Sequence, residues 1–182
     1  PQSVLDMYGA KPGDGSYASN CLLARRLAER GVRFIQLYHR GWDHHGGIRK
    51  YMGICCRLTD QPTAALISDL KRRGMLDDTL VIWGGEFGRT PIMNKNKGRD
   101  HWGPCFFAVF AGAGVLPGQV IGKSDEIGAY PVTRAFSPND VGATVYSLLG
   151  IDPHSAVRDR LNRPVHLNTG EVIESLFTGA AV

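Results

Sequence analysis

The chain has 182 residues, of which 43% are hydrophobic, and this is enough for one folded domain with a core of its own. Its formal net charge of +4 is mild and no long Lys/Arg run occurs, so composition gives no argument for nucleic acid or a membrane surface as a partner. No apolar stretch approaches the ~20 residues that a membrane span needs. The four cysteines have neither C-x-x-C nor zinc-finger spacing, which indicates buried thiols.

The first part of the chain is expected to contain one helix and one strand. Residues 1–18 are rich in Gly, Ser and Pro and are predicted to be irregular. Residues 19–30 have the apolar periodicity of an amphipathic helix, which Gly31 would end. The β-branched and apolar residues 32–39 predict a strand, and the loop G-W-D-H-H-G-G follows it.

The middle of the chain predicts a helix and two buried strands. The helix is expected to begin near residue 59 or 60, because Pro62 then lies in its first turn, and to end at Gly74. Residues 79–83 and 106–111 are continuous apolar runs, typical of strands buried on both faces of a parallel sheet.

The last part of the chain begins with a well-marked helix start. In S-P-N-D, residues 137–140, Ser is a favourable N-cap and Pro a favourable first residue, and Gly150 would close this helix. A short strand over 164–167 and a helix over 171–177 are predicted after it. The alternation of strands and helices predicts a single domain, 1–182, with a three-layer α/β/α fold and a mainly parallel sheet.

Three groups of polar residues lie where the predicted strands meet loops. The first is Asp43, His44 and His45, just beyond the strand over 32–39. Open α/β sheets place ligands at the carboxyl ends of their strands, and Asp with His suits Zn²⁺ or Mn²⁺. The alternative is a surface loop whose polar side chains face water.

The second and third groups each contain an acidic residue. Glu86 follows a glycine pair after the strand over 79–83, and its alternative role is capping or pairing with Arg89. Asp100 and His101 precede the strand over 106–111, and the alternative for His101 is a packed, hydrogen-bonded histidine.

Basic residues surround these two segments. They form either an anion-binding rim or a solvated basic loop, and they are Arg89, Lys95, Lys97 and Arg99. Because parallel strands would bring all three groups to one rim of the sheet, the sequence predicts a metal site there with cations beside it.

Several motifs are similar to a known family. D-D-T-L-V-I-W-G-G-E-F-G-R-T-P, G-R-D-H-W, A-G-A-G-V-L-P-G-Q-V-I-G-K-S-D-E and S-P-N-D-V-G-A-T-V-Y-S-L-L-G-I resemble the sulfatase-like family of uncharacterised bacterial proteins, domain of unknown function 1501. R-G-V-R-F-I-Q-L-Y-H-R-G-W-D-H-H-G resembles its upstream segment. That family is related to the alkaline phosphatase and sulfatase superfamily. The resemblance therefore implies a partial alkaline phosphatase-like fold and a small anionic ester as substrate.

The resemblance also implies a ligand set for one metal ion. Asp43 and His101 are similar to ligands of the superfamily, together with His45 or His44. Neighbouring residues of an extended loop point to opposite sides, so one of these two histidines is expected at the site, and the family pattern favours His45. Zinc is the expected metal, with manganese or calcium as alternatives.

Other positions depart from the superfamily pattern or extend it. Glu86 takes the place of the Asp in the superfamily's Asp-His pair, and Phe87 stands where the histidine of that pair would be, which puts a second metal site in doubt. The resemblance makes Arg89, Arg99 and Lys97 candidates for binding the substrate anion, and Asp100 a residue that supports a metal ligand.

The start P-Q-S-V-L-D-M-Y-G and the extent of the resemblance indicate the carboxyl-terminal part of such a protein. The nucleophile is then expected upstream of Pro1, and the family implies an exported bacterial protein. The functional hypothesis is the metal-binding part of a phosphate or sulfate ester hydrolase, inactive as this fragment. The alternative is a binding or scaffold protein that keeps the fold without catalysis. An unpaired sheet edge would favour self-association into a homo-oligomer.

Overall fold

The computed structural model describes residues 1–179 and divides into two compact units. Unit 1 is Pro1–Gly112, and unit 2 begins at Ala113. Every candidate site residue lies in unit 1, so the fold of this unit decides which of them meet.

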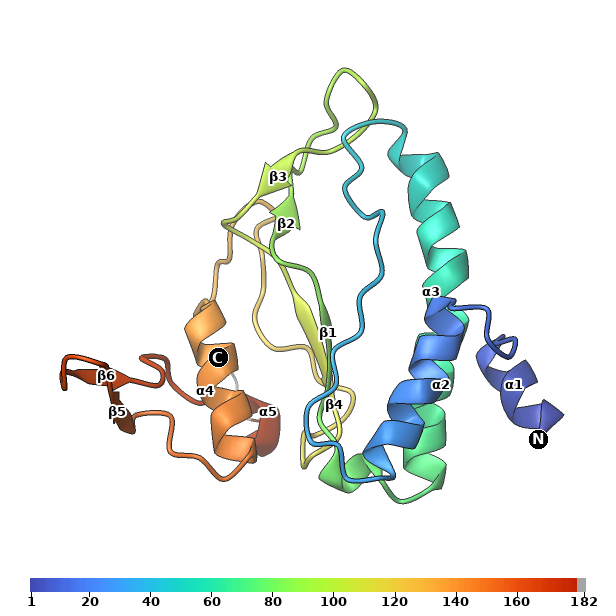
Figure 1. Cartoon of the computed structure of the whole chain (residues 1–182). Coiled ribbons are helices and arrows are strands. Elements are labelled where there is room, and N and C mark those ends of the chain that lie inside the picture. The colour runs from blue at the N-terminus through green and yellow to red at the C-terminus, as the bar shows by residue number, and fades with distance from the viewer. Residues whose placement is uncertain (180–182) are drawn as a thin grey trace. The chain divides into compact units, whose positions relative to one another are not determined.

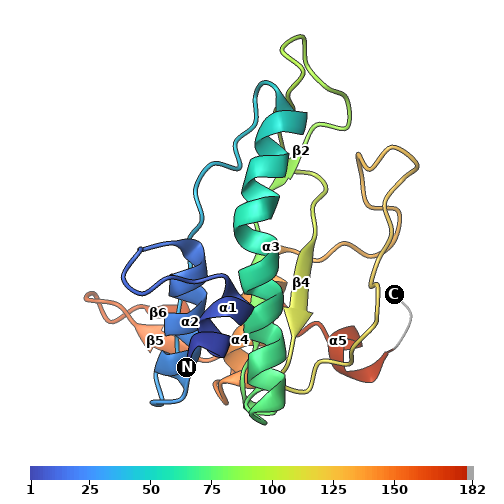
Figure 2. The same cartoon turned by 90° about the vertical axis from the view of Figure 1, so that its right-hand side faces the viewer.

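Helices make up one side of unit 1. They are α1 (Gln2–Tyr8), α2 (Tyr17–Ala28), α3 (Ile48–Arg72) and the single-turn 3-10 helix η1 (Leu76–Asp78). Figures 1 and 2 both show α1 and α2 lying along the carboxyl-terminal half of α3. The amino-terminal half of α3 extends beyond them, toward the loops that carry the candidate site.

The helix predicted over residues 19–30 is confirmed by α2. It begins two residues earlier because Ser16 is its N-cap, with the Ser16 hydroxyl accepting a hydrogen bond from the Ser19 amide at 3.1 Å. The prediction that residues 1–18 are irregular is wrong for Gln2–Tyr8. Composition underrated this segment because the fully buried Tyr8 anchors α1 in the core.

The helices of unit 1 pack together around an apolar core that also contains the buried carboxylate of Asp69. Its largest fully buried side chains are Tyr8, Cys21 and Leu70. Within it Asp69 of α3 accepts a hydrogen bond from the Tyr8 hydroxyl at 3.1 Å and pairs with Arg25 of α2, whose Nε lies 3.0 Å from Asp69 Oδ2. Burial, and then Asp69 itself, raise the pKa of Tyr8, so this hydroxyl remains a donor.

Helix α3 starts much earlier than the sequence indicated. It was expected to begin near residue 59 or 60, but its N-cap is Gly47, in the left-handed region with φ 55°, and Pro62 lies in its interior. Proline inside a helix costs about 3 kcal/mol, so local propensity favoured a later start. The packing of the buried face of α3 against α1 and α2 overrides that preference.

The strands of unit 1 form two small antiparallel pairs. Strand β1 (Val81–Gly84) pairs with β4 (Ala108–Ala111), with Val81 opposite Ala111. Strand β2 (Gly88–Arg89) pairs with β3 (His101–Trp102), with Arg89 opposite His101. The predicted strands over 79–83 and 106–111 therefore form, but they run in opposite directions.

The predicted three-layer α/β/α fold with a mainly parallel sheet, as in a partial alkaline phosphatase-like fold, is wrong. Within residues 1–179 the sheets are two-stranded and antiparallel, and residues 32–39 form no strand. A parallel pair needs a crossover connection, usually a helix. Between β1 and β4 the chain instead forms the β2–β3 hairpin, which returns it in the opposite direction.

The apolar runs were also expected to be buried on both faces. Instead Ile82, Trp83 and Val109 keep 41%, 39% and 46% of their surface exposed. An apolar run shows that a strand can be buried, but a further layer has to supply the burial. Neither face of the β1–β4 pair is fully covered within the described part of unit 1.

Unit 2 contains α4 (Pro138–Leu148), the hairpin of β5 (Ala156–Arg158) and β6 (Pro164–His166), and α5 (Ser175–Thr178). The helix start in S-P-N-D is confirmed: the Ser137 hydroxyl accepts from the Asp140 amide at 3.2 Å, and Asp140 Oδ2 accepts from the Ser137 amide at 2.6 Å. Strand β6 confirms the strand predicted over 164–167. Of the helix predicted over 171–177, only the α5 segment is helical.

The described helices were also compared with the requirements for crossing a bilayer. Over residues 1–179, none of them is both long enough and apolar enough to do so.

Candidate metal centre

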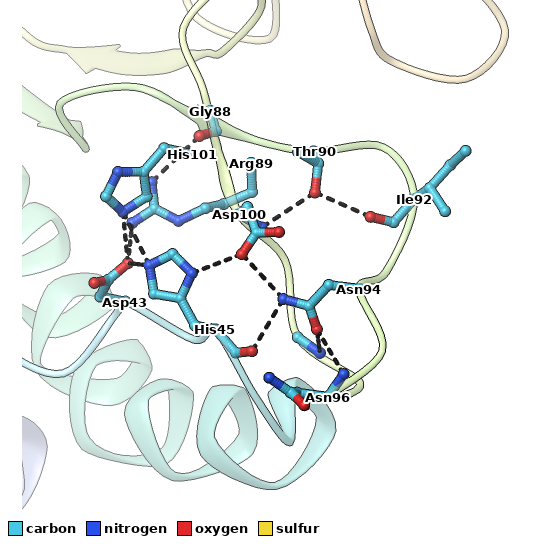
Figure 3. Close-up of polar contacts among 11 residues, drawn as sticks. Asp43, His45, Gly88, Arg89, Thr90, Ile92, Asn94, Asn96, Asp100 and His101 are labelled. Atoms are coloured by element: carbon cyan, nitrogen blue, oxygen red, sulfur yellow. Dashed lines mark hydrogen bonds and ion pairs between the residues drawn. The ribbon is translucent and has the colours of Figure 1, made fainter.

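The loop between residue 39 and α3 carries the first group of candidate residues. Asp43 and His45 point toward His101 of β3, as Figure 3 shows. His44 points elsewhere: only 6% of its surface is exposed, and its ring stacks on Tyr51 with centroids 6.2 Å apart. The loop therefore presents alternate side chains to the cluster, and His44 is part of the packing behind it.

A second loop, residues 94–100, fixes this arrangement by binding the first one through its backbone. The Arg99 amide donates to the His44 carbonyl at 2.9 Å, and the Gly47 amide donates to the Asn96 carbonyl at 3.0 Å. Gly98 allows the close approach, because a Cβ at this position would lie 2.1 Å from the His45 carbonyl carbon. These contacts hold His45 beside His101, the first residue of β3.

The hairpin then places His101 at the cluster. The Thr90 amide donates to the Asp100 carbonyl at 2.8 Å, next to the pairing of Arg89 with His101 in β2–β3. On its other side the His101 ring packs against Phe87, with centroids 4.6 Å apart. His101 is thus oriented by the hairpin backbone and by an aromatic contact.

Three ligand atoms converge at the centre of this arrangement. Asp43 Oδ1 lies 2.8 Å from His101 Nε2 and 3.0 Å from His45 Nε2, and the two Nε2 atoms lie 3.2 Å apart. These three residues form a group with the geometry to hold a metal ion. About half of each side chain is exposed, so the centre is open to solvent.

The charges around the centre are ordered by hydrogen bonds. The hydrogen bond from His101 lowers the pKa of Asp43, and the one from His45 lowers the pKa of Asp100, so both carboxylates are ionised at neutral pH. The Asp100 hydrogen bond raises the pKa of His45. Burial lowers the pKa of His44, which keeps that ring neutral. A cation at the centre would therefore meet ionised carboxylate and would compete with a proton on His45.

Arg89 is the cation closest to this centre. Its NH2 lies 3.6 Å from Asp43 Oδ1 and 3.5 Å from Glu86 Oε1, and its guanidinium lies over the Phe87 ring, 5.1 Å from the centroid. Glu86 pairs with Arg89 and is not a member of the group of three.

The other two candidate cations, Arg99 and Lys97, make hydrogen bonds that hold the loop 94–100 in place. Arg99 donates from NH1 to the Thr90 carbonyl at 3.1 Å, and the Lys97 carbonyl accepts from the Ile48 amide at 2.9 Å. The exposed side chain of Lys97 belongs to a residue in the left-handed region, with φ 58°. Of the predicted anion-binding residues, Arg89 is therefore the one that the structure places beside Asp43.

Sequence reasoning missed two residues that organise the centre. Asn94 Nδ2 donates to Asp100 Oδ1 and to the His45 carbonyl, both at 3.0 Å (Figure 3). The Thr90 hydroxyl accepts from the Asp100 amide at 3.1 Å. Asn94 opens the turn-like sequence N-K-N-K-G, and this composition was the available signal for a loop closed by its own side chains.

Comparison with known proteins identifies the family. A family model described as "Protein of unknown function (DUF1501)" matches residues 1–177. No curated protein and no solved structure matches the chain. Since the match extends over nearly the whole sequence, the chain belongs to the DUF1501 family of proteins of unknown function.

Proposed function

We propose that this chain supplies the metal-binding part of a hydrolase of phosphate or sulfate esters. Asp43, His45 and His101 would hold one divalent metal ion. The observation that carries the proposal is the triangle of their ligand atoms, with sides of 2.8, 3.0 and 3.2 Å. The resemblance of the motifs to the sulfatase-like family supplies the reaction class.

The size of this triangle suits a transition metal. Tetrahedral zinc with bonds of about 2.0–2.1 Å has neighbouring ligand atoms about 3.3 Å apart. An octahedral ion with bonds near 2.1 Å, such as manganese, has them about 3.0 Å apart. Calcium prefers a shell of oxygen atoms, and two imidazoles disfavour it. Zinc is the proposed metal, with manganese as the alternative.

The metal and the residues around it would have different roles in ester hydrolysis. When bound, the metal supplies Lewis acidity to an ester oxygen. Arg89 is 22% exposed and held over Phe87, so its guanidinium is poised to contact an anionic oxygen beside Asp43. Glu86, by pairing with Arg89, limits where that guanidinium can point.

A second candidate function is a binding or scaffold protein that keeps the metal-site residues without catalysis. The observation that favours it is Phe87, which packs against His101 at the position where the superfamily has the histidine of a second metal site. A single, half-exposed centre would then serve recognition or structure. Metal binding by this chain is expected under both functions.

Titration calorimetry of the purified chain with zinc and with manganese tests the metal site. The wild type should bind, more weakly than a closed four-ligand site does, and the Asp43→Ala/His101→Ala variant should lose binding. His154→Ala is the matched control, because its side chain is 53% exposed, close to the 50% of His101. Equal binding by wild type and double variant would show that the assignment is wrong.

The two functions are separated by ester turnover in the full-length protein. A hydrolase should convert nitrophenyl phosphate or nitrophenyl sulfate with metal present, and the conversion should disappear in Asp43→Ala. A scaffold protein should bind metal and convert neither ester.

A further inference from the structure

The ring of His45 is held from both sides. Its Nε2 faces Asp43 and His101, while its Nδ1 lies 2.8 Å from Asp100 Oδ1. The two nitrogens are on opposite edges of an imidazole, so Asp100 lies on the side of His45 away from the proposed metal (Figure 3). Asp100 is thus placed to act on the histidine rather than on the ion.

Asp100 is itself held by a side chain with a fixed orientation. Asn94 Oδ1 accepts from the amides of Asn96 and Gly98, both at 3.0 Å. An amide side chain has its oxygen on one side and its NH₂ on the other, so Asn94 Nδ2 is directed at Asp100 Oδ1 and the His45 carbonyl. One amide therefore ties the carboxylate to the backbone of the histidine that it contacts.

The backbone of Asp100 is fixed independently of its side chain. Its amide donates to the Thr90 hydroxyl at 3.1 Å, and its carbonyl accepts from the Thr90 amide at 2.8 Å. Substitution of the Asp100 side chain leaves these two contacts available, so the hairpin can survive the change.

We infer that Asp100 is a positioning residue that holds neutral His45 with its proton on Nδ1 and its lone pair on Nε2. An ionised carboxylate accepts hydrogen bonds only, so a neutral ring donates to one of its two carboxylate neighbours. Asp100 Oδ1 lies 2.8 Å from Nδ1, closer than the 3.0 Å between Asp43 Oδ1 and Nε2, and Asp43 Oδ1 already has His101 Nε2 at 2.8 Å, so the donor is Nδ1. The lone pair of Nε2 is then directed at the ligand group before any metal arrives. The consequence for metal affinity depends on the proposed function, but the tautomer is a property of the metal-free chain.

The chain offers a graded pair of variants for a test. Both contacts of Asp100 reach the same oxygen, Oδ1, so Asp100→Asn can keep them through its amide oxygen, whereas Asp100→Ala removes them. Asp60→Asn on the exposed part of α3 is the control for loss of an acidic side chain. Circular dichroism establishes that each variant is folded.

The first measurement is the ¹⁵N spectrum of the His45 ring in the metal-free protein in mildly alkaline buffer. Wild type and Asp100→Asn should show a protonated Nδ1 and an unprotonated Nε2. Asp100→Ala should shift toward the other tautomer or a mixture of both. If Asp100 only held the loop together, its loss would leave the tautomer of His45 unchanged. An Asp100→Ala spectrum like that of the wild type would therefore overturn the inference.

The second measurement is zinc affinity by calorimetry. Asp100→Ala should weaken binding by about 10- to 100-fold, as loss of such partners commonly does, and Asp100→Asn should weaken it less. Unchanged affinity in a folded Asp100→Ala would overturn the positioning role. If the alanine variant does not fold, a wild-type His45 ring with an unprotonated Nδ1 would overturn it. Equal binding by wild type and Asp43→Ala/His101→Ala would overturn the proposed function instead, and the tautomer result would still decide the role of Asp100.

Discussion

The Nε2 atoms of His45 and His101 lie 3.2 Å apart although the two residues are 56 positions apart in the sequence. This closeness does not come from a shared sheet rim. It comes from the loop 94–100, which hydrogen-bonds along residues 44–48 at the start of α3. The positions of the ligand atoms in the centre therefore depend on the hydrogen bonds between these two loops.

Gly98→Ala should disrupt this contact and weaken zinc binding by about tenfold or more, in the range seen when supporting partners are lost. The added Cβ would lie 2.1 Å from a backbone carbon of His45, and a backbone atom cannot rotate away. Gly103→Ala is the matched control, because a Cβ there meets nothing within 4 Å. Calorimetry of both variants gives the comparison, and equal affinities would mean that the loop contact does not hold the centre.

The buried ion pair between Asp69 and Arg25 should make a large contribution to the free energy of unfolding of unit 1. Asp69→Ala leaves the buried Arg25 without this partner, and we expect a loss of about 3–5 kcal/mol in the free energy of unfolding. Asp60→Asn, on an exposed position of the same helix, should change it by less than about 0.5 kcal/mol. Urea unfolding followed by circular dichroism measures both, and similar midpoints would contradict the role given to Asp69.

The capping box of α4 predicts a pH dependence in unit 2. The hydrogen bond from the Glu171 amide, and others from Ser137, lower the pKa of Asp140 below its usual value near 3.8. Its stabilising effect is then fully present above that usual value and is lost as the pH falls through the lower, folded-state pKa. The protection factors of the α4 amides against hydrogen exchange, which are corrected for the intrinsic pH dependence of exchange, should fall over that acidic range.

Asp140→Ala should abolish this component of the pH dependence and destabilise α4 by about 1 kcal/mol at neutral pH, as loss of a cap commonly does. Ser147→Ala, at an exposed position in the same helix, is the control and should leave both unchanged. If the protection factors of the α4 amides fell with acid in Asp140→Ala as they do in the wild type, the effect would belong to another group.

The chain as given should hydrolyse neither nitrophenyl phosphate nor nitrophenyl sulfate at a useful rate, with zinc, manganese or calcium added. The Thr90 hydroxyl, which lies in the loop of the centre, donates to the Ile92 carbonyl at 2.9 Å and accepts from Asp100, so it is engaged in holding the loop. The proposed function gives this chain the metal-binding groups and no nucleophile. Loss of a nucleophile commonly costs a factor of ~10⁶ in kcat. Turnover near ~1 s⁻¹ that disappears in Glu86→Ala would show instead that the catalytic groups are complete here.

The sequence by itself determined the local features of this protein. Helix α2, the S-P-N-D start of α4 and the existence of β1 and β4 follow from apolar periodicity and capping residues, which act over a few neighbouring positions. The motifs around Asp43 and His101 also selected the residues that converge.

Only the tertiary structure decided how these pieces combine. The direction of β4 relative to β1 depends on the hairpin between them, and the early start of α3 depends on packing that outweighs the cost of Pro62. The role of Asn94 and the backbone contact of Arg99 with His44 rest on hydrogen bonds between loops, whereas His45 was already favoured over His44 by the alternation of an extended loop. Such contacts join residues about 50 positions apart, and no periodicity or propensity within either loop encodes them.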